Sequence, residues 1–140
     1  PIGGGRGYPR TDAELKRQLE SFVAWTGLSL EQVRLLFERY GTRTEAVATF
    51  MQRAPDEPLK HVQGYTRREI AFLGVNEKCR HLDDLLLRRS MLAMLGRLNK
   101  EGVDELAGVL GEALAWGAEQ EKAEAMRALR ILEDKHGVRL

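Results

Sequence analysis

The stretch that decides the fold is GYTRREIAFLGVNEKCRHLDDLLLRRSMLAMLGRL, residues 64–98. Its pattern predicts two helices separated by a short break at residues 79–81. Thr66 is placed to cap the first helix, and Glu69, three positions later, is placed to close a capping box. The apolar content of the first helix comes from Ile70, Phe72, Leu73 and Val75. Leucines recur at helical spacing in the second helix, at Leu82, Leu85, Leu86, Leu92 and Leu95. A helix so rich in leucine is expected at the centre of a bundle, covered by the other helices.

The start of the second helix carries two adjacent acidic residues, Asp83 and Asp84. Neighbouring positions of a helix do not share a face, so the pair is not a device for general acid and base catalysis. Negative charge is favourable at a helix N-terminus, and we interpret both residues in this way. Asp84 and Arg88 form an i,i+4 pair that adds a few tenths of a kcal/mol if exposed.

Three helices are predicted before this centre. The expected N-terminal caps are Thr11, Ser29, and Thr42 or Thr44, with Glu14, Gln32 and Glu45 as capping-box partners. Gly27 and Gly41 are expected to end the first two helices. The expected apolar stripes are Leu15, Leu19, Phe22 and Val23, then Leu30, Val33, Leu36, Phe37 and Tyr40, then Val47, Phe50 and Met51.

Two helices are predicted after the centre. The first begins at Asn99 and carries an apolar stripe of Val103, Leu106, Ala107, Leu110 and Leu114. The second covers about residues 118–135, with Gly117 as a possible cap. Its expected inner face holds Met126, Leu129 and Leu132, and its expected charged face holds Glu119, Glu121, Lys122, Glu124 and Arg127. No alternating strand pattern appears, so the expected class is all-α, a compact bundle of about six to seven short helices without a sheet.

The sequence predicts a short linker followed by one helical domain. Residues 1–10, PIGGGRGYPR, are rich in glycine and proline and are interpreted as a linker. Residues 11–140 are expected to form a single helical domain. A start at proline rather than methionine suggests a piece of a longer protein. The glycines do not fit a phosphate loop, because no strand precedes them and Pro9 intervenes before the first helix.

Composition limits the classes of function. The 140 residues carry 22 basic and 21 acidic side chains, a net charge of +1, which gives no electrostatic case for nucleic-acid binding. One cysteine cannot form an internal disulfide, so a reducing, cytoplasmic location is expected. No apolar run approaches the roughly 20 residues that span a bilayer.

No catalytic, cofactor-binding or metal-binding residue is assigned from the residues themselves. Cys79 and His81 are neighbours, but a structural zinc site usually needs four ligands at regular spacing. Cys79 is interpreted as a buried structural cysteine rather than a nucleophile, since free cysteines are commonly buried. The residues by themselves therefore predict a helical domain that binds or supports another protein.

Arginines gather in and around the central stretch, at Arg67, Arg68, Arg80, Arg88 and Arg89. They could bind an anion, or form a buried interdomain salt bridge. We favour surface ion pairs with nearby carboxylates, Glu69, Glu77, Asp83 and Asp84. Residues 29–50 also have a helix–turn–helix rhythm, with Arg34, Arg39, Arg43 and Arg53 available to phosphates. Acidic residues alternate with these arginines, at Glu31, Glu38 and Glu45, and disfavour DNA binding.

A combination of short motifs carries a family resemblance. These are Tyr65-Thr66, Glu69, Asn76-Glu77, Arg80, Asp83-Asp84 and Arg88-Arg89-Ser90, with the turn Tyr40-Gly41-Thr42-Arg43, the step Leu114-Ala115-Trp116 and the glycine-rich lead-in. Together they resemble the C-terminal helical domain of FAD-dependent glycerol-3-phosphate dehydrogenases and glycerophosphate oxidases. The resemblance covers roughly residues 1–120.

The resemblance implies a parent enzyme that oxidises sn-glycerol 3-phosphate to dihydroxyacetone phosphate. Its FAD would accept the hydride and pass electrons to quinone, with the parent peripheral at the inner face of the cytoplasmic membrane. The implied partner of this chain is a preceding FAD-binding domain that holds the flavin and the substrate. The resemblance implies a structural or interdomain role for Glu77, Arg80, Asp84, Arg88 and Arg89. An independent helical module that binds protein or nucleic acid remains the alternative.

Overall fold

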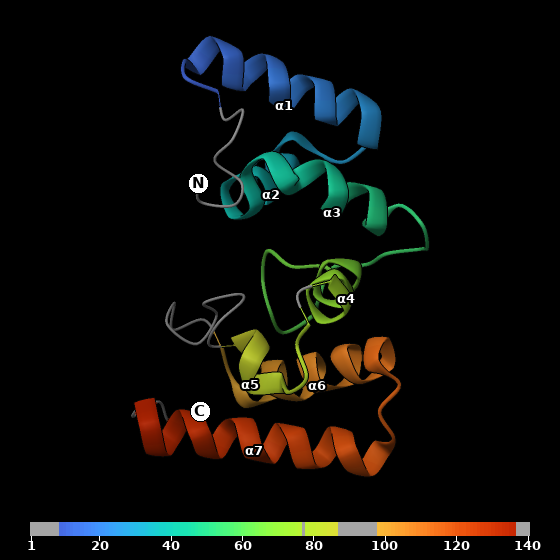
Figure 1. Cartoon of the computed structure of the whole chain (residues 1–140), viewed down its shortest axis with the longest axis vertical. Coiled ribbons are helices and arrows are strands. Elements are labelled where there is room, and N and C mark those ends of the chain that lie inside the picture. Colours follow the sequence, from blue (N-terminus) through green and yellow to red (C-terminus); the bar gives the residue numbers. More distant parts are fainter. Residues whose placement is uncertain (1–8, 77, 87–97, 137–140) are drawn as a thin grey trace. The chain divides into compact units, whose positions relative to one another are not determined.

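Every regular element is helical in the part of the chain that the computed structural model describes, residues 9–76, 78–86 and 98–136 (Figure 1). Within these residues the only departure is an isolated antiparallel bridge between Pro58 and Thr66. The predicted all-α class is therefore confirmed. The chain divides into two compact units, residues 1–55 and residues 56–140. A single domain over residues 11–140 and a linker over residues 1–10 stay predictions.

The first unit begins with two helices whose ends were predicted from sequence. Helix α1 covers Asp12–Thr26, and Thr11 caps it by accepting a hydrogen bond from the Glu14 amide. Gly27 ends it with a φ of 70°, a conformation that costs a glycine little. Helix α2 covers Leu30–Tyr40 behind a complete capping box, in which Ser29 and Gln32 each accept from the other's backbone amide.

The core of this unit lies between α1 and α2. Its buried members are Leu19, Val33 and Phe37, with Leu15, Phe22, Val23 and Leu28 packed around them. The rings of Phe22 and Phe37 lie 6.5 Å apart, within the range of favourable aromatic pairs. Leu30 is an exception to the predicted stripe: it is 55% exposed at the first position of α2.

A tight turn leads from α2 to the third helix. Gly41–Arg43 forms the 3₁₀ segment η1, and α3 covers Thr44–Met51. The buried hydroxyl of Thr44 donates to the Gly41 carbonyl at 2.7 Å, while Arg43 provides no side-chain cap. The helix begins at Thr44, one of its two predicted starts, but the N-cap position is occupied by Arg43 and not by a threonine.

The second unit holds the remaining helices. Helix α4 covers Arg67–Asn76, α5 covers Leu82–Asp84, α6 covers Lys100–Leu114 and α7 covers Ala118–His136. Thr66 accepts from the Glu69 amide at the start of α4, and Asn99 accepts from the Gly102 amide at the start of α6. Both starts agree with the sequence. Leu82, Leu85 and Leu86 are completely buried, as expected, while Leu92 and Leu95 lie outside the described residues.

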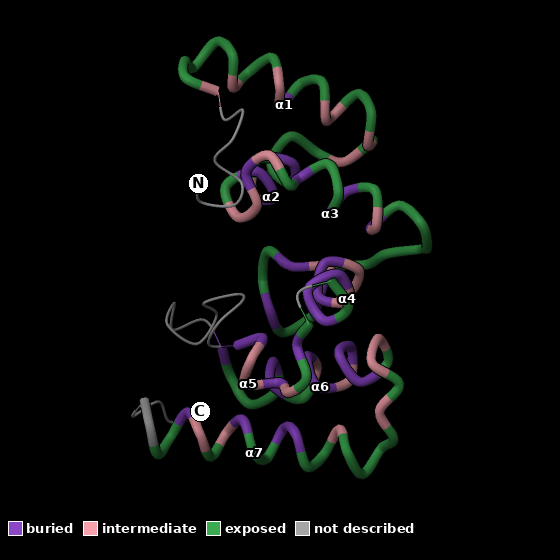
Figure 2. Tube along the Cα trace, in the orientation of Figure 1, coloured by how far each residue is buried: buried purple, intermediate pink, exposed green. Residues whose placement is uncertain are grey.

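Helix α6 forms the middle of this unit, because it packs against α4 on one side and α7 on the other (Figures 1 and 2). Val103, Leu106 and Leu110 are completely buried. The contact between α4 and α6 is close at Gly74, where an added Cβ atom would lie 2.5 Å from the Leu110 Cδ1 atom. Only glycine fits this crossing without a shift of Leu110.

The loop before α4 is attached to α6 by one carboxylate. Glu105 accepts hydrogen bonds from the Lys60 and His61 amides, each at 2.8 Å. Asp56 in the loop accepts from the Arg68 amide in the first turn of α4 at 2.9 Å. These bonds satisfy amides of the irregular segment and of the α4 start that have no helical partner.

The inner face of α7 agrees with the prediction at Leu132 and differs from it at Met126. Among the described residues of α7, the buried ones are Glu124, Ala125, Ala128 and Leu132, whereas Met126 is 62% exposed. The large apolar residues suggested one register, but small alanines allow α7 to approach its neighbours on another face. Val75 on α4 is likewise 51% exposed rather than buried. No helix in the described ranges is long and apolar enough to cross a membrane.

Candidate functional site

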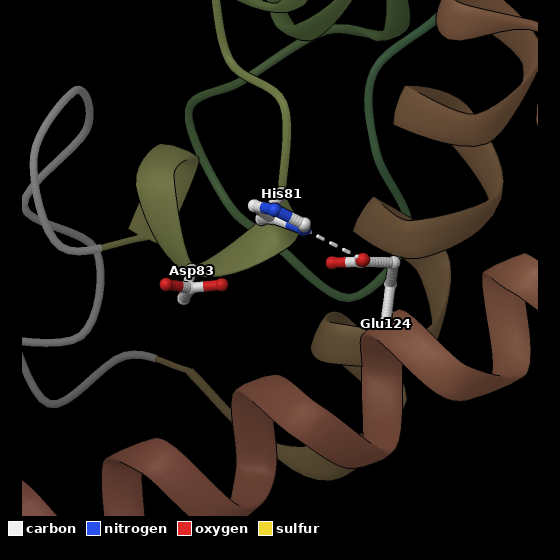
Figure 3. Close-up of side chains that lie close together, drawn as sticks. All are labelled: His81, Asp83 and Glu124. Carbon is white, nitrogen blue, oxygen red and sulfur yellow. Dashed lines mark hydrogen bonds and ion pairs between the residues drawn. The ribbon is translucent and has the colours of Figure 1, made fainter.

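A group of three polar side chains lies where α7 passes the start of α5. His81 and Asp83 come from the start of α5, and Glu124 comes from α7 (Figure 3). Each side chain offers a ligating atom, and these atoms lie within 4.8 Å of one another. An imidazole and two carboxylates in this arrangement can exchange hydrogen bonds, carry charge or hold a metal ion.

Glu124 adds a distant acceptor at the start of α5, beside the local one that Asp84 provides. The best N-terminal caps are short side chains with an oxygen, and the residue at this position is His81. Glu124 reaches across from α7 and accepts from the Leu82 amide through Oε2 at 3.1 Å. Its Oε1 atom lies 2.8 Å from the His81 Nδ1 atom. The carboxylate therefore satisfies a buried backbone donor and fixes the imidazole at the same time.

Asp84, one of the residues that the resemblance singled out, acts within its own turn. Its Oδ2 atom accepts from the His81 amide at 3.2 Å and from the Arg80 amide at 3.3 Å. This agrees with the sequence-based interpretation of acidic residues at the start of the helix. The segment before α5 is thus held from both directions, by Asp84 from within and by Glu124 from α7.

Asp83 faces α7 rather than the solvent. The Arg127 Nε atom lies 3.4 Å from the Asp83 Oδ1 atom, with about a fifth of the Asp83 side chain exposed. This ion pair and the Glu124 cap are separated by one turn of α7, so both tie the same pair of helices together. Glu124 and Arg127 were predicted on a solvated charged face; that interpretation is wrong for Glu124, which is buried.

The other residues singled out from the sequence do not belong to the group of His81, Asp83 and Glu124. Glu77, Arg88 and Arg89 lie outside the described residues, so their proposed interdomain role stays a prediction. Arg80 is exposed. Arg67 pairs with Glu112 at 2.8 Å and Glu57 at 3.7 Å, which are not the carboxylates expected from sequence. Cys79 is buried, as expected for a structural cysteine.

Sequence reasoning missed the role of Glu124. One signal was available: Ala125, Ala128 and Leu132 follow a helical spacing that places Glu124 beside the apolar stripe. The larger side chains of Met126 and Leu129 instead predicted that another face of α7 is buried. The pairing of Glu124 with a position 42 residues earlier cannot be read from local spacing.

The fold and this site define an all-α domain whose polar residues connect its own helices. A family model described as the C-terminal domain of alpha-glycerophosphate oxidase matches residues 1–121. The chain belongs to this family, as the resemblance predicted.

Curated relatives support the assignment. The glycerol-3-phosphate dehydrogenase of Mycobacterium leprae (strain TN) is 33% identical over 110 residues, which are 75% of this chain and 18% of that protein. Glycerol-3-phosphate dehydrogenase 2 of Mycobacterium tuberculosis (strain ATCC 25618 / H37Rv) is 32% identical over 109 residues, 74% of this chain and 18% of that protein. The chain is therefore a C-terminal domain of the glycerol-3-phosphate dehydrogenase family. No solved structure matches it.

The range matched by the family model contains only part of the polar site. Residue 121 lies in the first turns of α7, so Glu124 and Arg127 lie beyond the matched range, whereas His81 and Asp83 lie within it. The site thus joins the family's central segment to a helix that the family model covers only at its start.

Proposed function

We propose that this chain is the accessory C-terminal domain of an FAD-dependent dehydrogenase that oxidises sn-glycerol 3-phosphate to dihydroxyacetone phosphate. The observation that carries the proposal is the family match over residues 1–121. Relatives named glycerol-3-phosphate dehydrogenase are aligned over three quarters of this chain, which spans only 18% of their length. The bulk of such a parent therefore lies outside this chain.

The flavin is assigned to the preceding part of the parent. A dinucleotide-binding fold places the pyrophosphate where a strand turns into a helix. The described residues of this chain contain no strand and so do not fit such a site. FAD, when bound to the parent, would accept the hydride and pass electrons to quinone at the membrane surface. No catalytic residue is assigned to this chain.

The task proposed for this chain is to dock on the FAD-binding domain and support it. Five charged residues are the proposed structural or interdomain contacts, Glu77, Arg80, Asp84, Arg88 and Arg89. Asp84 supports this role indirectly, because it organises the amides of residues 80 and 81 and so sets the direction in which the chain enters α5. The exposed Arg80 is available to a partner surface.

Reconstitution tests the proposal. The parent is expressed with and without the region that corresponds to this chain, and dye reduction by glycerol 3-phosphate and flavin retention are measured. We expect both to fall in the truncated enzyme and to recover when the chain is added in trans. A truncated enzyme with full activity and no affinity for the chain would instead favour an independent interaction module.

A second experiment tests whether the two arginines that follow α5 in the sequence contribute to docking. The double variant Arg88→Ala/Arg89→Ala should bind the truncated parent at least tenfold more weakly, with its helical circular dichroism unchanged. Arg34→Ala is the matched control, because Arg34 forms an exposed ion pair within α2 of the first unit. Equal affinity of the double variant and the control would remove these arginines from the interface.

A further inference from the structure

We infer that His81, Asp83 and Glu124 form a binding site for a divalent transition-metal ion of the zinc type. The inference is independent of the parent's reaction, because it concerns only the contact between α5 and α7. Its basis is the convergence of one imidazole and two carboxylates from two different helices (Figure 3). Three protein ligands and one water molecule are a common zinc environment.

The spacing suits a small ion. The His81 Nδ1 and Glu124 Oε1 atoms are 2.8 Å apart, and the three ligating atoms span at most 4.8 Å. Two ligands of a tetrahedral zinc ion, each at about 2.0–2.1 Å, are separated by roughly 3.4 Å. His81 and Glu124 are therefore almost in place, and Asp83 must approach by rotation of its side chain.

Glu124 is already oriented as a ligand. Its side chain is only 9% exposed, and a buried carboxylate requires a compensating charge or hydrogen bonds. The Leu82 amide holds Oε2, which leaves Oε1 directed at the His81 ring. Ligating carboxylates are typically fixed in this way, by a hydrogen bond to the oxygen that does not touch the metal.

Asp83 gives separate support for a cation site at this position. Its Oδ1 atom is buried and accepts no hydrogen bond from any described residue, although Arg127 lies 3.4 Å away as an ion-pair partner. The Arg127 side chain is 49% exposed, so it can turn into the solvent when a cation approaches. Arg127 pairs with Asp83, whereas the Glu124 carboxylate contacts the His81 ring and the Leu82 amide, so a divalent cation placed among the three side chains would balance the negative charge of both carboxylates.

The donor set selects among metals. An imidazole nitrogen favours zinc and its transition-metal neighbours, whereas calcium and magnesium prefer sites built from oxygen alone. Binding would clamp α7 to the start of α5 through the ion rather than through a hydrogen bond. The site would therefore strengthen the contact that the Glu124 cap already makes.

Calorimetric titration of the 140-residue chain with zinc chloride tests the inference. We expect one zinc ion per chain, and at least tenfold weaker binding by His81→Ala and by Asp83→Asn. His61→Ala is the matched control, since His61 is an exposed histidine of the same unit and should bind zinc like the wild type. Magnesium chloride should give no saturable heat.

The variant Glu124→Gln separates the metal site from the cap. Glutamine keeps an oxygen that can accept from the Leu82 amide but removes the ligand charge, so the fold should persist while zinc affinity falls at least tenfold. Equal zinc affinity in wild type, Asp83→Asn and Glu124→Gln would overturn the inference. A stoichiometry far below one zinc ion per chain would do the same, and would leave the three side chains with the capping role alone.

Discussion

The first turns of α2 and α5 differ in where the acceptors of their backbone amides come from. At α2, Ser29 and Gln32 satisfy each other's backbone amides within four residues of chain. At α5, Asp84 accepts locally from the His81 amide, but the acceptor of the Leu82 amide is Glu124, 42 residues further along the chain. A local cap forms as soon as its turn forms, whereas a distant cap exists only when α7 has docked. The second arrangement couples the start of one helix to the position of another.

Removal of the distant cap should have the largest effect. Glu124→Ala leaves the buried Leu82 amide without its acceptor and the His81 ring without its partner, and we expect a loss of about 2–4 kcal/mol in the free energy of unfolding. Urea denaturation followed by circular dichroism measures this loss. Glu119→Ala, at an exposed position in the first turn of the same helix, is the control and should cost less than about 1 kcal/mol, through the helix dipole alone. A loss no larger than that of the control would mean that α5 does not depend on α7.

A glycine pair tests whether α4 and α6 are also fixed by tertiary contact. Gly74→Ala places a methyl group against Leu110 and should destabilise the chain by about 1–3 kcal/mol. Gly108→Ala on α6 meets no atom within 4 Å and should stabilise it by about 0.5–1 kcal/mol, through helix propensity. Thermal unfolding compares the two variants directly. Stabilisation by both would show that the crossing can open to admit a side chain.

The local cap should matter less than the distant one. Ser29→Ala removes one half of the capping box of α2 and should cost about 1 kcal/mol. Ser21→Ala, at an exposed position inside α1, provides a control that loses no cap. Chemical denaturation of both variants measures the difference. If Ser29→Ala cost as much as Glu124→Ala, sequence separation would not distinguish the two kinds of cap.

The smallest effect is expected at the surface of α2. Arg34 and Glu38 form an i,i+4 ion pair at 3.4 Å, with 71% and 60% of their side chains exposed. Solvent screening limits such pairs, so Arg34→Ala should cost at most about 0.5 kcal/mol. The same denaturation experiment in high salt should remove even this difference. A larger loss would show that Arg34 has a packing role beyond its charge.

Much of this molecule follows from local chemistry. The caps at Thr11, Ser29, Thr66 and Asn99 could be predicted, because each acceptor and its donor lie within three residues of one another. The same holds for the stop at Gly27 and for the buried leucines at the start of the second central helix. The family resemblance over roughly residues 1–120, which the family model confirms over residues 1–121, also came from short motifs.

The tertiary structure decided which face of α7 is buried and what caps α5. The sequence ranked Met126 above Ala125 for burial by side-chain size, but close packing of helices selects for shape as well as for hydrophobicity. It could not pair Glu124 with His81, because a hydrogen bond across 43 positions depends on how α7 docks. Local sequence fixes the elements and their ends, since those energies arise within one turn. The polar site arises between helices, and only their packing creates it.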